Sequence, residues 1–174
     1  MRLSEIAAYL SKLTGRDEAK IHIALRSPAM KSLFRREPGP TPKSPDDYAP
    51  IELVRARLLL AGQSCGLTVT ELGHVSDALN KAITPKQGGR VPSHLEELVS
   101  ARDWVIRVRY TEDAEGERHA FVAIGPESEL LARTDDERRA HEALNALDHT
   151  TDVGHLIIPA SDLIAPLLPL LAEG

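Results

Sequence analysis

The stretch that decides the fold is LSEIAAYLSKLTGRDEAKIHIALRSPAMKSLFRR, residues 3–36. Its apolar residues recur at the spacing that places them on one face of a helix. A first helix is expected with Ser4 as an early cap and Gly15 as the stop, because glycine readily adopts the left-handed conformation that follows a helix. A second helix begins near Asp17, whose charge suits the helix dipole, and ends before Pro28. The stretch therefore predicts a helix-turn-helix unit.

The second helix carries basic residues away from its inner stripe of Ile21, Ala24 and Leu25. A helix fits the major groove of DNA, and Arg and Lys side chains suit guanine edges and phosphates. We therefore expect Asp17–Arg26 to read the major groove, and the basic residues after it to hold the DNA backbone. The candidate DNA-binding residues are Arg16, Lys20, His22, Arg26, Lys31, Arg35, Arg36 and Lys43.

Charge is distributed unevenly along the chain. Residues 1–43 contain nine of the 21 Lys and Arg residues and four of the 26 Asp and Glu residues, a net charge of +5. The remaining residues carry 12 basic and 22 acidic side chains, a net charge of −10. A basic head on an acidic body is typical of a DNA-contacting protein. The same head could instead be a solvated face, or could bind an acidic protein partner.

Composition favours a cytoplasmic protein. The 174 residues suit one compact domain or two small ones. The single cysteine, Cys65, excludes an internal disulfide and indicates a reducing compartment. The most apolar segment, residues 156–172, is interrupted by proline and aspartate, and Glu5 interrupts any signal-peptide core. No membrane partner is therefore expected.

The segment after the helix-turn-helix is first rich in proline and then rich in leucine. Residues 37–50 hold five prolines and are predicted to be a connector without regular structure. Ile51–Ser64 is so rich in leucine that it is expected to be a central core helix. Thr68 and Glu71 have the spacing of a capping box, which predicts the start of another helix.

The second half mixes helices with strands. Ser93 and Glu96 form a second capping box. Alternating side chains predict a hairpin of Trp104–Tyr110 and His119–Ile124. Further elements are expected as a helix over 134–147, a strand over 153–158 and a proline-containing helix or turn over 160–171.

These elements predict an α+β fold that is mostly helical. A helix-turn-helix or winged-helix-like unit would pack on a helix pair, and a small C-terminal part would contain the hairpin. The predicted division is a DNA-binding region at residues 1–84, with its connector at 37–50, and an α+β dimerisation or sensor region at residues 85–174.

The order of elements resembles MerR-type regulators, which have an N-terminal helix-turn-helix, a loop or wing, and then a helix pair. Residues 4–7, Ser-Glu-Ile-Ala, and Thr14-Gly15 look like the family's first helix and turn, and residues 51–79 resemble the later helix pair. The resemblance covers residues 3–80 and implies sequence-specific DNA binding. Two departures are an extra turn in the first helix and the lack of the usual aromatic pair, replaced by Leu25-Arg26. A generic helix-turn-helix regulator, for instance of a mobile element, fits equally well.

The sequence shows no pattern that favours an enzyme, a metal or a cofactor. The spacing of its seven histidines matches no metal motif. Cys65, with His74 as the nearest candidate base, is expected to be a buried structural thiol. Gly88-Gly89-Arg90 lacks the rest of a phosphate loop and is expected to be a flexible loop or a wing.

The most favoured function is a sequence-specific regulator that binds double-stranded DNA as a homodimer, because helix-turn-helix proteins usually bind two half-sites. The alternative is an adaptor with a basic head. Trp104 and its hairpin face would pack on helices, or form a dimer surface or a small-ligand pocket. Ile51–Leu60 and Leu163–Leu171 are further candidates for a dimer surface.

Overall fold

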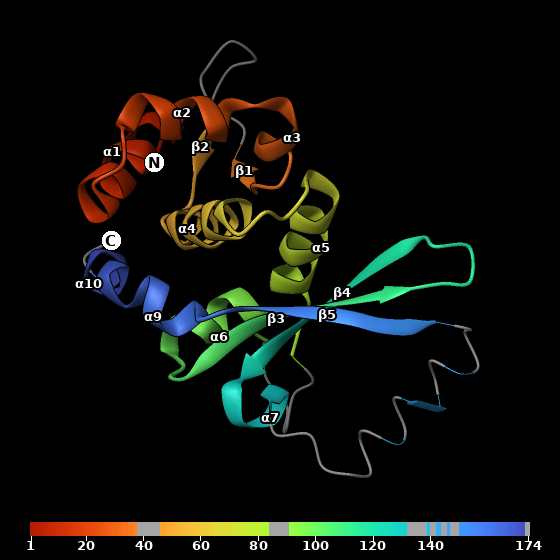
Figure 1. Ribbon diagram of the computed structural model, residues 1–174. Coiled ribbons are helices and arrows are strands. Elements are labelled where there is room, and N and C mark those ends of the chain that lie inside the picture. Colours follow the sequence, from red (N-terminus) through yellow and green to blue (C-terminus); the bar gives the residue numbers. More distant parts are fainter. Residues whose placement is uncertain are drawn as a thin grey trace. The chain divides into compact units, whose positions relative to one another are not determined.

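The computed structural model describes residues 1–37, 46–83, 91–131, 139, 142–143, 146 and 150–172. It confirms the expected α+β class with mostly helical content (Figure 1). The chain divides into two compact units, Met1–Ser76 with Asp162–Gly174, and Asp77–Ser161. The C-terminal residues from 162 onward therefore belong with the helix-turn-helix, whereas the sequence pattern placed them in the second region.

The first unit begins with α1 (Leu3–Thr14) and α2 (Glu18–Arg26), which contact each other (Figure 1). Gly15 has a φ of 66°, so the predicted glycine stop is confirmed. Ser4 is not the cap, because the Glu5 carboxylate accepts the backbone N–H of Arg2 at 2.7 Å and the helix starts earlier. Pro28 ends α2 as expected and occupies the first turn of the short α3 (Pro28–Lys31).

A two-stranded hairpin follows α3, which corrects the prediction for residues 37–50. β1 (Arg36–Glu37) pairs antiparallel with β2 (Asp47–Tyr48), and residues 38–45 lie outside the described residues. Pairing is possible because none of the four strand residues is proline. The Tyr48 ring packs edge-on against Phe34, with centroids 6.1 Å apart, and so anchors the hairpin base.

α4 (Ile51–Ser64) is the core helix that the sequence predicts, and nine of its residues are buried. α5 (Val69–Asn80) begins at the predicted capping box, where the Thr68 N–H donates to the Glu71 carboxylate at 2.6 Å and the Glu71 N–H to the Thr68 hydroxyl at 3.3 Å. Cys65 caps the end of α4 and is exposed, so the expectation of a buried thiol is wrong.

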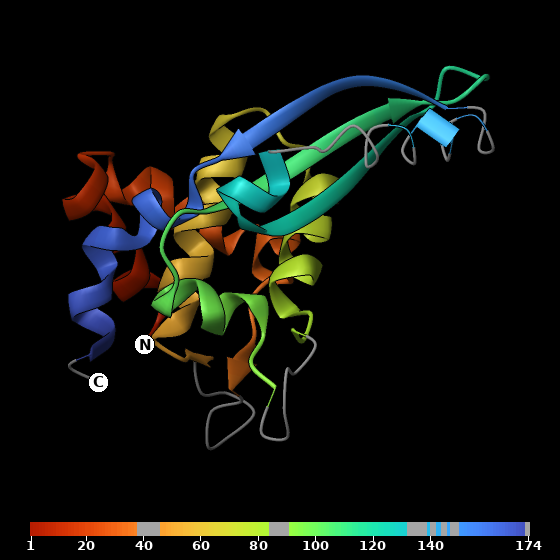
Figure 2. The ribbon, with the colours of Figure 1, turned by 90° about the horizontal axis from the view of Figure 1, so that it is seen from below.

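The second unit contains an antiparallel sheet with the strand order β4-β3-β5 (Figure 2). β3 (Trp104–Glu112) and β4 (Arg118–Pro126) form the predicted hairpin, extended at both ends. β5 (Thr151–Ile158) pairs with β3, with an irregularity between Tyr110 and Thr111. The face that carries Ile106 and Val108 is buried.

Short helices complete the two units. α6 (His94–Ser100) begins at the predicted Ser93–Glu96 capping box, and α7 (Glu127–Leu131) follows β4. The chain continues through α9 (Ala160–Ile164), a 3₁₀ turn and α10 (Leu168–Ala172), which confirms helical structure at the predicted position. The loop at 84–90 and most of the helix expected over 134–147 lie outside the described residues.

Candidate nucleic-acid interface

The turn between α1 and α2 is fixed by local hydrogen bonds. The Ser11 hydroxyl donates to the Arg16 carbonyl at 2.7 Å, and the Asp17 carboxylate caps α2 by accepting the Lys20 N–H at 2.9 Å. Ile21 and Leu25 are fully buried and hold α2 against the core. α2 is therefore a rigidly mounted helix with one face free.

The free face of α2 combines basic and apolar side chains. Ala19, Lys20 and Arg26 are exposed, and Ile23 is 71% exposed. The side chains of Lys20 and Arg26 have no ion pair among the described residues. Ile23 was not among the predicted contact residues, although its position two residues from the buried Ile21 places it on the opposite side of the helix. His22, a predicted contact, is half-buried.

Arg16 points back toward α4 and not outward along α2. Its guanidinium Nη1 donates to the Ser64 hydroxyl at 3.1 Å, at the C-terminal end of α4. Arg16 also lines a shallow hollow with Arg57, between α1, α2 and α4. Arg16 is exposed, but one of its side-chain donors is engaged by the fold itself.

Arg57 is a further basic residue near α2, and the sequence pattern does not mark it as a candidate contact because it falls within the apolar face of Ile51–Ser64. Its Nε is buried without a hydrogen-bond partner, and its side chain has no ion pair among the described residues. Burial lowers the pKa of the Arg57 guanidinium, and the charge of Arg16 lowers it further. The hollow that Arg16 and Arg57 line is too small to hold a water molecule, so an anion could approach their charges only from outside it.

The basic residues after α2 are less available than predicted. The Lys31 amine lies 2.8 Å and the Arg36 guanidinium 3.6 Å from the carboxylate of Asp46, so one acid offsets both charges. The Arg35 backbone N–H donates to Glu52 at 3.2 Å, while its side chain is exposed. Lys43 lies outside the described residues. DNA contacts by these residues stay a prediction.

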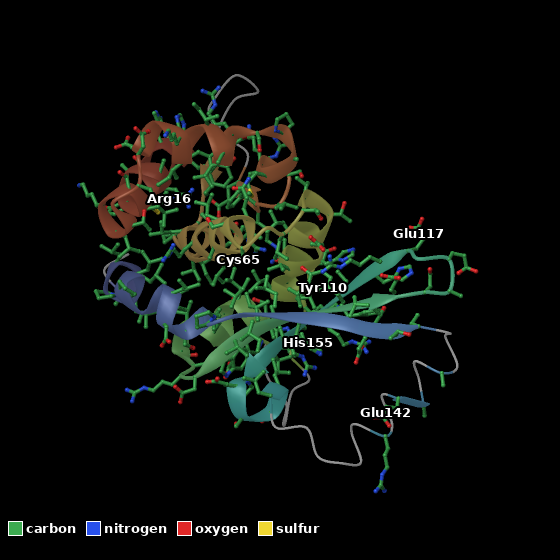
Figure 3. The ribbon with its side chains drawn as sticks, in the orientation of Figure 1. Arg16, Cys65, Tyr110, Glu117, Glu142 and His155 are labelled. Carbon is green, nitrogen blue, oxygen red and sulfur yellow. The ribbon has the colours of Figure 1, made fainter. Side chains whose placement is uncertain are left out.

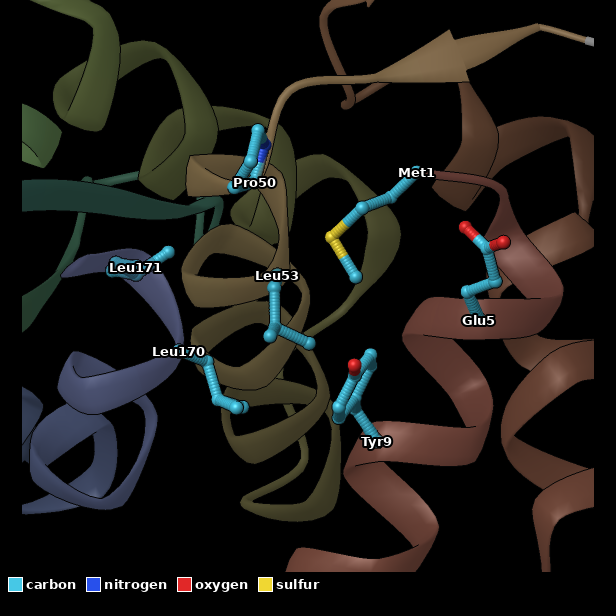
Figure 4. A pocket seen from close by; sticks show the side chains of 7 residues that line it. All are labelled: Met1, Glu5, Tyr9, Pro50, Leu53, Leu170 and Leu171. Atoms are coloured by element: carbon cyan, nitrogen blue, oxygen red, sulfur yellow. The ribbon is translucent and has the colours of Figure 1, made fainter. Parts of the chain in front are cut away.

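A pocket of about 430 Å³ lies elsewhere on the same unit (Figure 4). It is lined by Met1, Glu5, Tyr9, Pro50, Leu53, Leu170 and Leu171. The Glu5 carboxylate, its one acidic group, already caps α1. The tail 163–171, a predicted dimer surface, thus contributes to this hollow beside α1 and α4, and the burial of α4 leaves Ile51–Leu60 little surface for a second copy.

Other chemistry is sparse within the part of the chain that the structure describes. There, no group of three or more His, Cys, Asp or Glu side chains could hold a metal ion. Within the same residues, no helix is both long and apolar enough to cross a membrane. Comparison with known protein families, curated protein sequences and solved structures finds no match for this chain.

Proposed function

We propose that this protein is a sequence-specific DNA-binding transcriptional regulator that reads the major groove with α2. The observation that carries the proposal is the free face of α2, where Lys20, Ile23 and Arg26 project from a helix that is capped, buried on its other side and preceded by a glycine turn. A rigid helix with such a face has the size and the chemistry to enter the groove.

The arrangement around α2 supports this proposal. The β1–β2 hairpin after the helix-turn-helix corresponds to a wing, and α4 and α5 follow it as a helix pair. This is the order that the resemblance to MerR-type regulators implies. Arg16 and Arg57 line a hollow near the start of α2, and a phosphate of the duplex would offset their charges from outside this hollow.

Each part of the face would have its own role. Arg26 and Lys20 would contact base edges or phosphates through charge-assisted hydrogen bonds. Ile23 would make an apolar contact with a base. Because a single short helix contacts few base pairs, the protein would act as a homodimer on a site with two-fold symmetry.

Selection from a library of random DNA duplexes at two salt concentrations tests the proposal. We expect an enriched motif with two-fold symmetry, and affinity that falls steeply as salt rises. The double variant Lys20→Ala/Arg26→Ala should lose the motif, whereas Lys81→Ala, an exposed lysine of the second unit, should keep it.

Two outcomes would contradict the proposal. Binding that depends on salt but enriches no motif would show that the basic N-terminal region is a nonspecific DNA-binding surface. No binding at low salt would exclude a DNA reader. The basic head would then fit the adaptor alternative, whose partner is an acidic protein surface.

A further inference from the structure

The second unit contains a pocket that the DNA-binding proposal does not use. Its volume is about 580 Å³, within the range of about 300–1,000 Å³ that is usual for small-molecule sites. α6, β3, β4 and α7 contribute its walls, which include Trp104, His94, Glu97, Glu129, Ile124 and Leu130. We call it the Trp104 pocket.

Apart from the indole N–H of Trp104, the polar side chains that line the Trp104 pocket belong to His94, Glu97 and Glu129. Glu97 and Glu129 have carboxylates without an ion pair among the described residues. The His94 Nδ1 lies 3.1 Å from the Ala78 carbonyl, so the backbone occupies this ring nitrogen. None of the described residues that line the pocket is Lys or Arg. The pocket lining therefore carries two carboxylates and no Lys or Arg among the described residues, and a cationic ligand would supply the missing positive charge.

The apolar and aromatic walls define the rest of the ligand. Trp104 and His94 lie with ring centroids 6.2 Å apart at a tilt of 54°, and both side chains are half-buried. An indole face attracts cations, because its π-electrons carry partial negative charge. Ile124 is buried and Leu130 half-buried, so they provide an apolar floor.

We propose that the Trp104 pocket binds a small organic cation, with an ammonium or guanidinium group on an apolar body. The cationic group would lie between the two carboxylates and against the indole, and the apolar body on Ile124 and Leu130. The nearby guanidinium of Arg107 does not line the pocket, and it donates to the Leu130 carbonyl. Binding of this kind is independent of whether the first unit binds DNA.

Trp104 is the only tryptophan of the chain, so its fluorescence reports on this pocket alone. The full-length protein is titrated with pentylammonium and with pentan-1-ol, which have the same number of heavy atoms but differ in charge. A ligand of this size is expected to bind with a Kd on the order of 1 mM. We expect a saturable change with pentylammonium and none with the alcohol. The indole N–H resonance provides a second readout if fluorescence is silent.

Variants identify the groups responsible. Glu97→Gln and Glu129→Gln should each weaken binding by about tenfold, because each removes a charged acceptor. Glu117→Gln is the matched control. Glu117 is an exposed acid at the turn of the β3–β4 hairpin (Figure 3), at the opposite end of the strands from the Trp104↔Pro126 pair. It should bind like wild type.

Tetramethylammonium carries a positive charge but no N–H donor, so it separates attraction to the indole from hydrogen bonding to the acceptors. If it binds as well as pentylammonium, attraction to the indole is sufficient, and if it binds more weakly, donation to the acceptors contributes. Either result fits the proposal. The proposal is overturned if neither the fluorescence nor the indole resonance responds to pentylammonium, if the alcohol binds equally well, or if both Gln variants bind like Glu117→Gln.

Discussion

The guanidinium Nε of Arg55 lies 2.8 Å from the carboxylate of Glu52, and the two side chains are only 1% and 2% exposed. Arg55 also donates to the Ser76 hydroxyl at 3.0 Å, and Glu52 accepts the Arg35 N–H. Burial raises the pKa of Glu52 and lowers that of Arg55, while each charge opposes the shift of the other. The pair thus connects α4, α5 and the segment before the hairpin. Each buried charge depends on the other for its compensation.

Arg55→Met should lower the free energy of unfolding by about 3–5 kcal/mol, because it leaves the Glu52 carboxylate buried without its partner. Adding Glu52→Gln should restore a large part of that loss, since the second change removes the unpaired charge. Urea denaturation of the variants measures both effects. Lys12→Met, at an exposed site of α1, is the control. A loss from Arg55→Met no larger than that of the control would show that the pair does not hold the unit together.

Asp46 makes stability depend on acid pH. The hydrogen bond from Lys31 holds the pKa of the Asp46 carboxyl below 3.8, and Arg36 contributes in the same direction. A carboxyl whose pKa is lowered in the folded state stabilises the protein above its unfolded pKa, and this contribution is lost as the pH falls through the folded pKa. Wild type should therefore lose more stability below about pH 4 than Asp46→Asn does.

Unfolding midpoints at neutral and at acid pH, together with a carboxyl NMR titration, check this prediction. Asp47→Asn is the neighbouring control, because Asp47 is exposed and has no ion pair among the described residues. If Asp46→Asn and wild type lose the same stability in acid, the contact with Lys31 is too weak in solution to affect folding.

Local signals in the sequence predicted much of the fold. The capping boxes at Thr68 and Ser93 mark helix starts correctly, because each backbone N–H donates to the side-chain oxygen three residues away regardless of tertiary context. The alternation around Trp104–Tyr110 predicts the hairpin because successive side chains of a strand point to opposite faces. Burial of one face therefore leaves an apolar residue at every second position.

Features that depend on contacts distant in sequence could not be predicted. Strands of two residues, such as Asp47–Tyr48, are too short to show periodicity, and their pairing is anchored by Phe34 and not by their own pattern. Residues 162–174 belong with the first unit through contacts that no local signal records. At the candidate site, helical spacing correctly predicts that Ile21 is buried, but an apolar side chain such as Ile23 carries no charge that would mark it as a DNA contact.

Ile23 should read a thymine methyl group. Replacing each thymine of the selected site by uracil removes one methyl, and contact with Ile23 predicts a loss of about 0.8 kcal/mol, about fourfold in Kd, at one position per half-site. The variant Ile23→Ala should show no such loss at that position. Fluorescence anisotropy with substituted duplexes measures the difference.

Val69→Ala is the control for this experiment, because Val69 is another exposed apolar residue of the first unit, 54% exposed at the start of α5. It should retain the thymine dependence. If DNA binds but no thymine methyl contributes, Ile23 does not face the bases although α2 still contacts the duplex. If no duplex binds at all, the proposed function itself fails.

Arg57 should favour function at the expense of stability. Its guanidinium is partly buried beside Arg16, its Nε has no hydrogen-bond partner, and its side chain has no ion pair among the described residues, so Arg57→Met removes a desolvated charge without breaking an ion pair. We expect Arg57→Met to be as stable as wild type or more stable. If Arg57 contacts a phosphate, the same variant should bind every duplex more weakly, and the slope of log K against log salt should become shallower by about 0.9.

Urea denaturation and anisotropy titrations at several salt concentrations measure these two effects on one protein preparation. Arg102→Met, at an exposed site of the second unit, should change neither quantity. The combination of retained stability and weaker, less salt-dependent binding distinguishes a phosphate contact from a structural arginine, because a structural arginine would lose stability when replaced. Unchanged DNA affinity in Arg57→Met would instead show that the hollow between α1, α2 and α4 does not face the DNA backbone.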